Sequence, residues 1–276
     1  MTGATKPIVD VTGVDKHFEA AGATTTALEG IDLRIGGGEF VSLIGPSGCG
    51  KSTLLRLIAD LTAPTAGEIL VNEKSARRAR LDRDYGMVFQ APVLFDWRTI
   101  DENVQLPLEV MGVSRADRQK RSTRMLSLVE LSDFARHHPW QLSGGMQQRA
   151  AIARALAFEP KLLLMDEPFG ALDEMTRERM NDGLLRIWER TGTTVVFVTH
   201  SIPEAVFLSS RVVVMSARPG RITDVIEIDL PRPRNEETRE TERYFSLITA
   251  VREALRSGHM TDRIDEPAPV ETEPEW

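Results

Sequence analysis

The chain has 276 residues, of which 34 are basic and 41 acidic, so its formal net charge is −7. With 41% hydrophobic and 27% charged residues, the composition is that of a globular protein and excludes a fibrous or wholly disordered chain. A single cysteine excludes a disulfide scaffold, and the sequence shows neither a membrane-spanning apolar run nor a secretory signal, so we expect a cytoplasmic protein that can still dock onto a membrane protein.

The N-terminal third is expected to be rich in β-strands. Short runs of β-branched or apolar residues predict strands at residues 8–14, 27–35, 39–44 and 67–71. Glycines at 36–38 predict a turn, and apolar residues at helical spacing predict a helix after Gly50. Residues 74–83 are basic, but Asp82 and Asp84 interrupt them, so we expect a solvated loop rather than a nucleic-acid patch.

The rest of the chain alternates helices and strands. Helical spacing predicts helices at residues 104–132, 144–158 and 173–190. Short apolar runs predict strands at residues 161–165, 194–198, 212–215 and 222–228. This succession predicts an α/β sheet that carries a helical subdomain at about residues 91–150.

Residues 45–52, GPSGCGKS, fit the spacing G-x-x-x-x-G-K-[ST] between a predicted strand and a predicted helix. The glycines let the backbone curl so that its N–H groups point at phosphate oxygens, and the helix adds its N-terminal partial positive charge. Lys51 supplies a cation to the β- and γ-phosphates, and Ser52 supplies a hydroxyl to Mg²⁺. Cys49 is either a redox sensor or a small residue in a tight loop, and we favour the second interpretation.

Two carboxylates follow the apolar run 162–165. Ligands bind open α/β sheets at the carboxyl ends of the strands, where Asp166 and Glu167 are expected to lie. Asp166 would hold Mg²⁺, directly or through water, and Glu167 would act as the general base for the attacking water. Such a pair is often only a helix cap, but its combination with Lys51 favours a phosphoryl-transfer site.

A second anion-binding helix start is predicted at Ser143. Its side chain can cap the following helix, and Gly144 and Gly145 leave backbone N–H groups open to a phosphate. One γ-phosphate does not need two cradles from the same chain. The simplest solution is a head-to-tail pair in which the second cradle of each copy closes over the ATP of the other.

The sequence LSGGMQQR at residues 142–149, together with the phosphate loop and the order of the motifs, resembles the ATP-binding-cassette (ABC) ATPases over about residues 8–230. The resemblance implies a P-loop NTPase core with a mixed sheet, an N-terminal antiparallel β subdomain and an inserted α-helical signature subdomain. It also implies ATP and Mg²⁺ as cofactors and a dimer of ATPase subunits.

The resemblance assigns further residues to the site. Gln90 would link the Mg²⁺ and water site to the membrane subunit, Asp173 would lie in the loop that crosses the dimer interface, and His200 would contact the γ-phosphate. Phe18 either stacks on adenine or is an ordinary packing aromatic. The catalytic residues are then expected to be Lys51, Gln90, Glu167 and His200. The residues expected to hold Mg²⁺ are Ser52, Gln90 and Asp166. ATP contacts are expected from Phe18, Gly45, Pro46, Ser47, Gly48, Cys49, Gly50, Lys51, Ser52, Thr53, Ser143, Gly144, Gly145 and Asp173.

Residues 90–99, 217–222 and 230–234 resemble the importers of nitrate, sulfonates and taurine, to which importers of pyrimidine-type heterocycles are related. Asp96 stands where that group usually has proline. The resemblance implies an ATPase subunit at the cytoplasmic face of the cell membrane, with integral membrane permease subunits and an extracytoplasmic solute-binding protein as partners. Phe95 and Trp97 either form the lip of a groove for a short cytoplasmic permease helix or pack within the helical insert.

A soluble ABC ATPase of DNA repair or translation is the alternative. Repair types carry long heptad coiled coils in the insert and translation types carry two cassettes, and neither feature is present in this sequence.

We expect a nucleotide-binding domain at residues 1–234, a C-terminal helix at 235–260 and a disordered acidic tail at 261–276. Apolar residues at helical spacing over 236–257 predict the helix. The last 15 residues hold six acids and one base, so the rest of the chain is nearly neutral. A nearly neutral body argues against nucleic acid as a partner.

Overall fold

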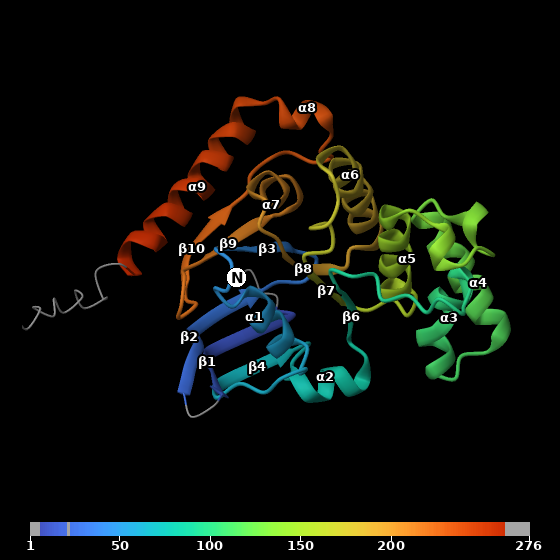
Figure 1. The fold of residues 1–276 in the computed structure, drawn as a ribbon, viewed down its shortest axis with the longest axis horizontal. Helices are drawn as coiled ribbons and strands as arrows, with labels where there is room; N and C mark the ends of the chain where they lie inside the picture. Colours follow the sequence, from blue (N-terminus) through green and yellow to red (C-terminus); the bar gives the residue numbers. More distant parts are fainter. Residues whose placement is uncertain (1–5, 21–22, 263–276) are drawn as a thin grey trace, which may run out of the picture.

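The computed structural model describes residues 6–20 and 23–262, whose strands gather into two sheets (Figure 1). The smaller sheet is antiparallel, with the order β2-β1-β4-β5, and consists of β1 (Val9–Ala20), β2 (Ala23–Ile35), β4 (Ala66–Val71) and β5 (Lys74–Ser75). Near the end of β2, buried Ile31, Leu33 and Ile35 alternate with exposed residues. One face of this sheet therefore packs on the core while the other meets solvent.

The larger sheet has the order β10-β9-β3-β8-β7-β6 and is parallel except for β10, which pairs antiparallel with β9. Its strands are β3 (Phe40–Ile44), β6 (Tyr85–Val88), β7 (Leu162–Asp166), β8 (Thr194–Val198), β9 (Arg211–Met215) and β10 (Ile222–Glu227). Every residue of β3, β7 and β8 is buried, as expected when both faces of a parallel sheet are covered. The carboxyl ends of these three strands lie at one edge of the sheet. The sequence motifs at the end of each strand therefore lie close together at that edge.

Helices cover the larger sheet. On one face, α1 (Lys51–Ile58) shares a hydrophobic cluster with the smaller sheet. The other face packs against α6 (Glu174–Thr191), α7 (Ile202–Leu208) and α9 (Glu242–Asp262). A separate group beyond β6 contains α3 (Ile100–Val110), α4 (Arg115–Leu128) and α5 (Gly144–Leu156) (Figure 1). The α/β class, the mixed sheet, the antiparallel N-terminal sheet and the helical insert are confirmed.

Residues 74–83 form β5 and α2 (Ala76–Asp82), so the prediction of a solvated loop is wrong. Ser75 caps α2 by accepting a hydrogen bond from the N–H of Arg78 at 3.3 Å. Lys74 forms ion pairs with Asp82 and Asp84 at 2.9 and 2.7 Å. The acids among these basic residues thus stabilise a local structure, which the charge pattern alone does not indicate.

Two predicted helices are each broken in two. The stretch 104–132 contains α3 and α4. The first ends at Val110 and is followed by Gly112, whose φ of 73° is a conformation that glycine adopts without strain. The stretch 236–257 contains α8 (Glu236–Arg239) and α9, because the Thr241 hydroxyl accepts from the N–H of Tyr244 at 3.2 Å and starts a new helix. Residues 263–276, most of the predicted tail, lie outside the described residues.

The elements β6 and α7 were not predicted from the sequence. Gly86 weakens the strand signal of β6, yet a Cβ at this position would clash with the Ala155 carbonyl of α5, so the close approach requires glycine. With seven residues, α7 is short and follows β8 almost directly. No helix within residues 6–20 and 23–262 combines the length and the apolar character that crossing a bilayer requires.

Candidate functional site

The phosphate loop connects β3 to α1. Gly48 and Gly50 have φ values of 78° and 95°, which side-chain-bearing residues rarely adopt. Gly50 is the N-cap of α1 and offers no side chain to its first turn. The N–H groups that follow are therefore available to an anion, where the helix dipole also favours negative charge. The backbone of this loop thus has the form that a phosphate site requires.

Lys51 lies with its ammonium group inside the loop. Its Nζ donates to the carbonyl oxygens of Gly45 and Pro46 at 2.9 and 3.0 Å, and the side chain is buried. The Sγ of Cys49 lies 3.7 Å from the same ammonium group. Burial raises the pKa of the Cys49 thiol, so it stays protonated and unreactive near neutral pH. This favours the packing interpretation of Cys49 over a redox sensor.

Ser52 and Asp166 are in direct contact, although they are far apart in the sequence. The Ser52 hydroxyl donates to Oδ1 of Asp166 at 2.6 Å. Ser52 lies in the first turn of α1 and Asp166 ends β7, so the sheet edge brings them together. Two oxygen groups beside a phosphate cradle fit Mg²⁺, which prefers oxygen ligands and completes its shell with phosphate and water.

Glu167 and His200 also lie side by side at this edge. His200 Nδ1 is 3.3 Å from Oε2 of Glu167, so the ring tautomer with its proton on Nδ1 can donate a hydrogen bond to this carboxylate. Glu167 has a φ of 46°, a left-handed value that is uncommon for a long side chain. Its backbone N–H donates to the Val198 carbonyl of β8 at 3.0 Å, which fixes this turn. The backbone therefore aims the carboxylate at the histidine.

Gln90 approaches the same carboxylate from the loop after β6. A Cβ built on Gly170 would lie 3.5 Å from Nε2 of Gln90 and 3.6 Å from Oε2 of Glu167, so the two groups flank Gly170. The signature helix α5 holds this loop, since Gln148 donates to the Phe89 carbonyl at 3.0 Å and Arg154 to the Val93 carbonyl at 2.7 Å. The Gln90 loop and α5 are thus fixed to each other.

The phosphate loop opens into a pocket of about 400 Å³. Phe18 of β1 lines it together with Thr25 and Ala27 of β2, so this aromatic ring lies beside the loop as the adenine interpretation requires. Phe18 is 43% exposed, which is high for a packing residue. The other residues that line the pocket are Ser47, Gly48, Gly50, Lys51, Ser52, Thr53, Glu167 and Arg218.

Arg218 was not predicted as a site residue. Its Nε donates to the Gly48 carbonyl at 3.3 Å, which brings a cation to the rim of the phosphate loop. In the sequence, residues 217–222 indicate only a resemblance to one importer group. Arg218 and Gly48 are 170 positions apart, so only the fold shows that they meet.

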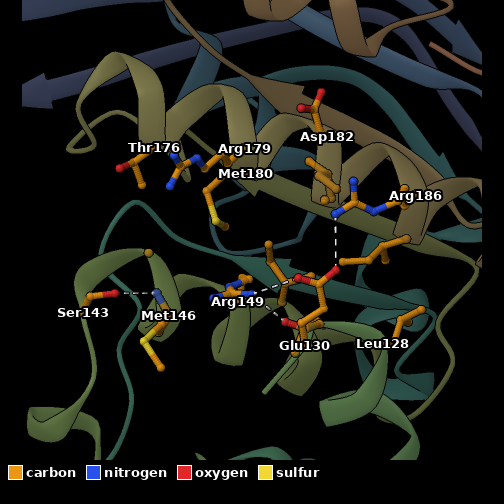
Figure 2. Close-up of a pocket in the computed structure, with 16 residues that line it drawn as sticks. Leu128, Glu130, Ser143, Met146, Arg149, Thr176, Arg179, Met180, Asp182 and Arg186 are labelled. Atoms are coloured by element: carbon orange, nitrogen blue, oxygen red, sulfur yellow. Dashed lines mark hydrogen bonds and ion pairs between the residues drawn. The ribbon is translucent and has the colours of Figure 1, made fainter. Parts of the chain in front are cut away.

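Ser143 does not line the pocket of the phosphate loop. It caps α5 by accepting from the Met146 N–H at 3.4 Å, and it is exposed. Together with Gly145 and Thr176 it lines a separate pocket of about 530 Å³ between α5 and α6, shown in Figure 2. Gly144, next to it, is exposed as well. Within the described residues, the second predicted cradle therefore does not face the first.

Asp173 is exposed at the start of α6. Its Oδ1 accepts a hydrogen bond from the N–H of Thr176 at 3.0 Å, and this bond lowers the pKa of the Asp173 carboxyl. Asp173 lines neither of the two pockets, so its expected place in a loop at the dimer interface stays a prediction.

Comparison with known proteins identifies relatives along most of the chain. Residues 28–170 match the family model described as ABC transporter. A putative ATP-binding protein of Brucella abortus is 49% identical over 229 residues, which cover 83% of this chain and 87% of that one. The aliphatic sulfonates import ATP-binding protein SsuB of Bacillus cereus is 45% identical over 82% of this chain and 88% of its own length.

Solved structures share the fold. A dimeric ATP-binding cassette in a post-hydrolysis state, bound to ADP and Pi, superimposes with a TM-score of 0.71 at 38% identity and covers 80% of this chain and 98% of its own. The cbiO1 protein of Clostridium perfringens, part of the transporter complex cbiONQ, gives a TM-score of 0.74 at 27% identity over 93% of this chain and 99% of its own.

Proposed function

Because the chain belongs to the ABC transporter family and is one of its ATPases, we propose that it is the ATP-hydrolysing subunit of an importer at the cytoplasmic face of a membrane. Two copies bind two ATP molecules head to tail, and their closure moves the permease subunits docked on them. An extracytoplasmic solute-binding protein delivers the solute. The closed pair binds ATP better than ADP, and this difference in affinity converts hydrolysis into motion.

The main support for this proposal is that the two phosphate cradles, the phosphate loop and the helix start at Ser143, lie at separate sites. The pocket of the phosphate loop contains no residue of α5, and Ser143 is exposed at the start of that helix. A second copy in head-to-tail orientation brings its own Ser143 to the open pocket and completes the site. A solved relative is described as a dimer bound to ADP and Pi, which supports a pair of copies.

In the proposed reaction, Lys51 exchanges its bonds to Gly45 and Pro46 for bonds to phosphate oxygens. Ser52 and Asp166 would hold Mg²⁺, which would supply positive charge to offset that of the phosphates. Glu167 accepts a proton from the attacking water as the water oxygen bonds to the γ-phosphorus and the bond to the ADP oxygen breaks. His200 keeps the carboxylate in place through its Nδ1–H.

An exposed aromatic surface near the Gln90 loop suits a permease helix. Trp97 is 74% exposed and contacts Phe95 in a tilted arrangement with 4.7 Å between ring centroids. Trp140 is 70% exposed and stacks on His138, whose Nδ1 lies 3.2 Å from the Asp96 carbonyl. Large exposed aromatics mark interaction sites, and this surface is continuous with the loop that carries Gln90. We therefore favour the groove interpretation for Phe95 and Trp97.

We propose aliphatic sulfonates as the solute, since several similar relatives are named as aliphatic sulfonate importers. A strain that lacks this chain is expected to lose growth on an alkanesulfonate as sole sulfur source. Plasmid-borne wild-type protein should restore growth and uptake of the labelled sulfonate. If uptake of nitrate or a pyrimidine precursor is lost while sulfonate uptake is normal, the proposed solute is wrong.

Arg218 is expected to strengthen ATP binding. Its guanidinium group lies at the rim of the phosphate loop, where charge-assisted hydrogen bonds to phosphate oxygens are strong. Arg218→Ala should weaken ATP affinity about tenfold, in line with the loss of about one charged hydrogen bond. Fluorescent-nucleotide titration measures this. Arg221→Ala is the matched control, because Arg221 pairs with Glu29 at 2.9 Å and does not line the pocket. Equal affinities for all three proteins would exclude the role.

A further inference from the structure

The backbone on both sides of His200 is tied to α7, the short helix that follows it. The Thr199 hydroxyl donates to the carboxylate of Glu204, which is a buried residue of α7. The same hydroxyl accepts from the Ser201 N–H at 3.0 Å, and Ser201 caps α7 by accepting from the Glu204 N–H at 3.4 Å. The direction of His200 therefore depends on where α7 lies.

Arginines of the segment 231–234 hold the other end of α7. Arg234 Nη1 donates to the carbonyl oxygens of Val206, Phe207 and Ser209 at 3.2, 2.7 and 2.8 Å. Arg232 donates to the Leu208 carbonyl at 3.0 Å. These are carbonyls at the end of the helix, which have no partner within it and carry its negative partial charge. A cation at this position satisfies them and complements the dipole.

The burial of Arg234 is unusual for a charged side chain. It is 7% exposed, and its guanidinium group forms no ion pair with a carboxylate within the described residues. Burial lowers the pKa of Arg234 to about 9, which still leaves it charged at neutral pH. A buried charge is costly unless it is well hydrogen-bonded, so Arg234 depends on the carbonyls of α7 as much as they depend on it.

The C-terminal helices α8 and α9 also contact α7. The Tyr244 hydroxyl of α9 donates to the Pro203 carbonyl in the first turn of α7 at 3.1 Å. The Arg239 guanidinium of α8 lies 3.6 Å from the centre of the Phe207 ring. Residues 228–262 thus pack against α7, although none of them lines the phosphate-loop pocket.

We propose that Arg234 is a positioning residue for His200, which it holds at hydrogen-bond distance from Glu167 by fixing the C-terminal end of α7. The proposal rests on the proposed roles of His200 and Glu167 in hydrolysis. Without the guanidinium group, three carbonyls at the end of α7 lose their donor and the helix shifts. A displacement of about 1 Å at a reacting group can cost on the order of 100-fold in rate, so even a smaller shift is measurable.

The test is the steady-state kinetics of Arg234→Met. We expect kcat to fall about tenfold while KM for ATP stays within about twofold, because α7 contributes nothing to the pocket that binds the nucleotide. Arg234→Lys keeps a cation that can donate to these carbonyls and should recover part of the rate. Arg243→Met is the matched control, since Arg243 pairs with exposed Asp229 at 2.8 Å.

A double-mutant cycle distinguishes positioning from general destabilisation. If Arg234 acts through His200, then Arg234→Met lowers the single-turnover rate of the wild type but not that of His200→Ala. An equal loss in both backgrounds would refute the proposal. If His200→Ala alone hydrolysed ATP at the wild-type rate, the role of His200 itself would be wrong, which is a separate failure. Should Arg234→Met not fold, Arg234→Lys gives the same cycle with a smaller expected loss.

Discussion

Replacing Glu167 with glutamine is expected to slow ATP hydrolysis at least about 100-fold and to leave ATP binding intact. A positioned general base contributes on the order of 100- to 10,000-fold, and the amide cannot take the proton from water. Glutamine has nearly the same shape, and its oxygen can still accept from His200 Nδ1, which lies 3.3 Å from Glu167 Oε2. The variant should therefore bind ATP and remain a closed dimer. Phosphate release and nucleotide titration give the two measurements.

The control is Glu159→Gln, which makes the same change at an exposed acid paired with Arg124 at 2.7 Å and outside both pockets. It should hydrolyse ATP at the wild-type rate. Hydrolysis by Glu167→Gln at that same rate would mean that another group accepts the proton. The strained φ of Glu167 would then need a different explanation.

The chemistry of the site could be predicted from the sequence because it depends on local spacing. The glycines of residues 45–52 determine the loop conformation, and the apolar run before Asp166 indicates a buried strand that ends at the ligand-binding edge. Phe18 was uncertain in the sequence, and the pairing of β1 with β2 explains its position beside the phosphate loop.

Other features depend on contacts between distant segments and had no local signal. Arg218 reaches Gly48 across 170 positions, and Arg234 reaches Val206 across 28. Gly86 lowers the strand propensity of β6 while permitting the contact with α5, so its local and tertiary effects oppose each other. The helix α2 buries only the small residues Ala76 and Ala79, so its apolar pattern is weak in the sequence, and ion pairs and a cap add to its stability.

Replacing Ser143 with arginine is expected to abolish ATP-dependent dimerisation and to leave the ATP affinity of the monomer unchanged. Ser143 is exposed and does not line the phosphate-loop pocket, so binding within one copy is unaffected. In the proposed head-to-tail pair this position would face the γ-phosphate of the other copy, and the larger side chain would block the approach. Hydrolysis should fall with dimerisation. Sedimentation velocity with ATP in the Glu167→Gln background measures the dimer directly.

Arginine at this position also removes the hydrogen bond that caps α5, which typically costs about 1 kcal/mol of stability. Ser114→Arg separates the two effects, because Ser114 is also exposed and caps α4 by accepting from the Asp117 N–H at 3.2 Å. This control should lose similar stability but dimerise normally. Undiminished dimerisation of the Ser143 variant would refute the shared site. Loss of dimerisation in both variants would show that the lost helix caps cause it, because Ser143, unlike Ser114, is expected to meet a partner's nucleotide.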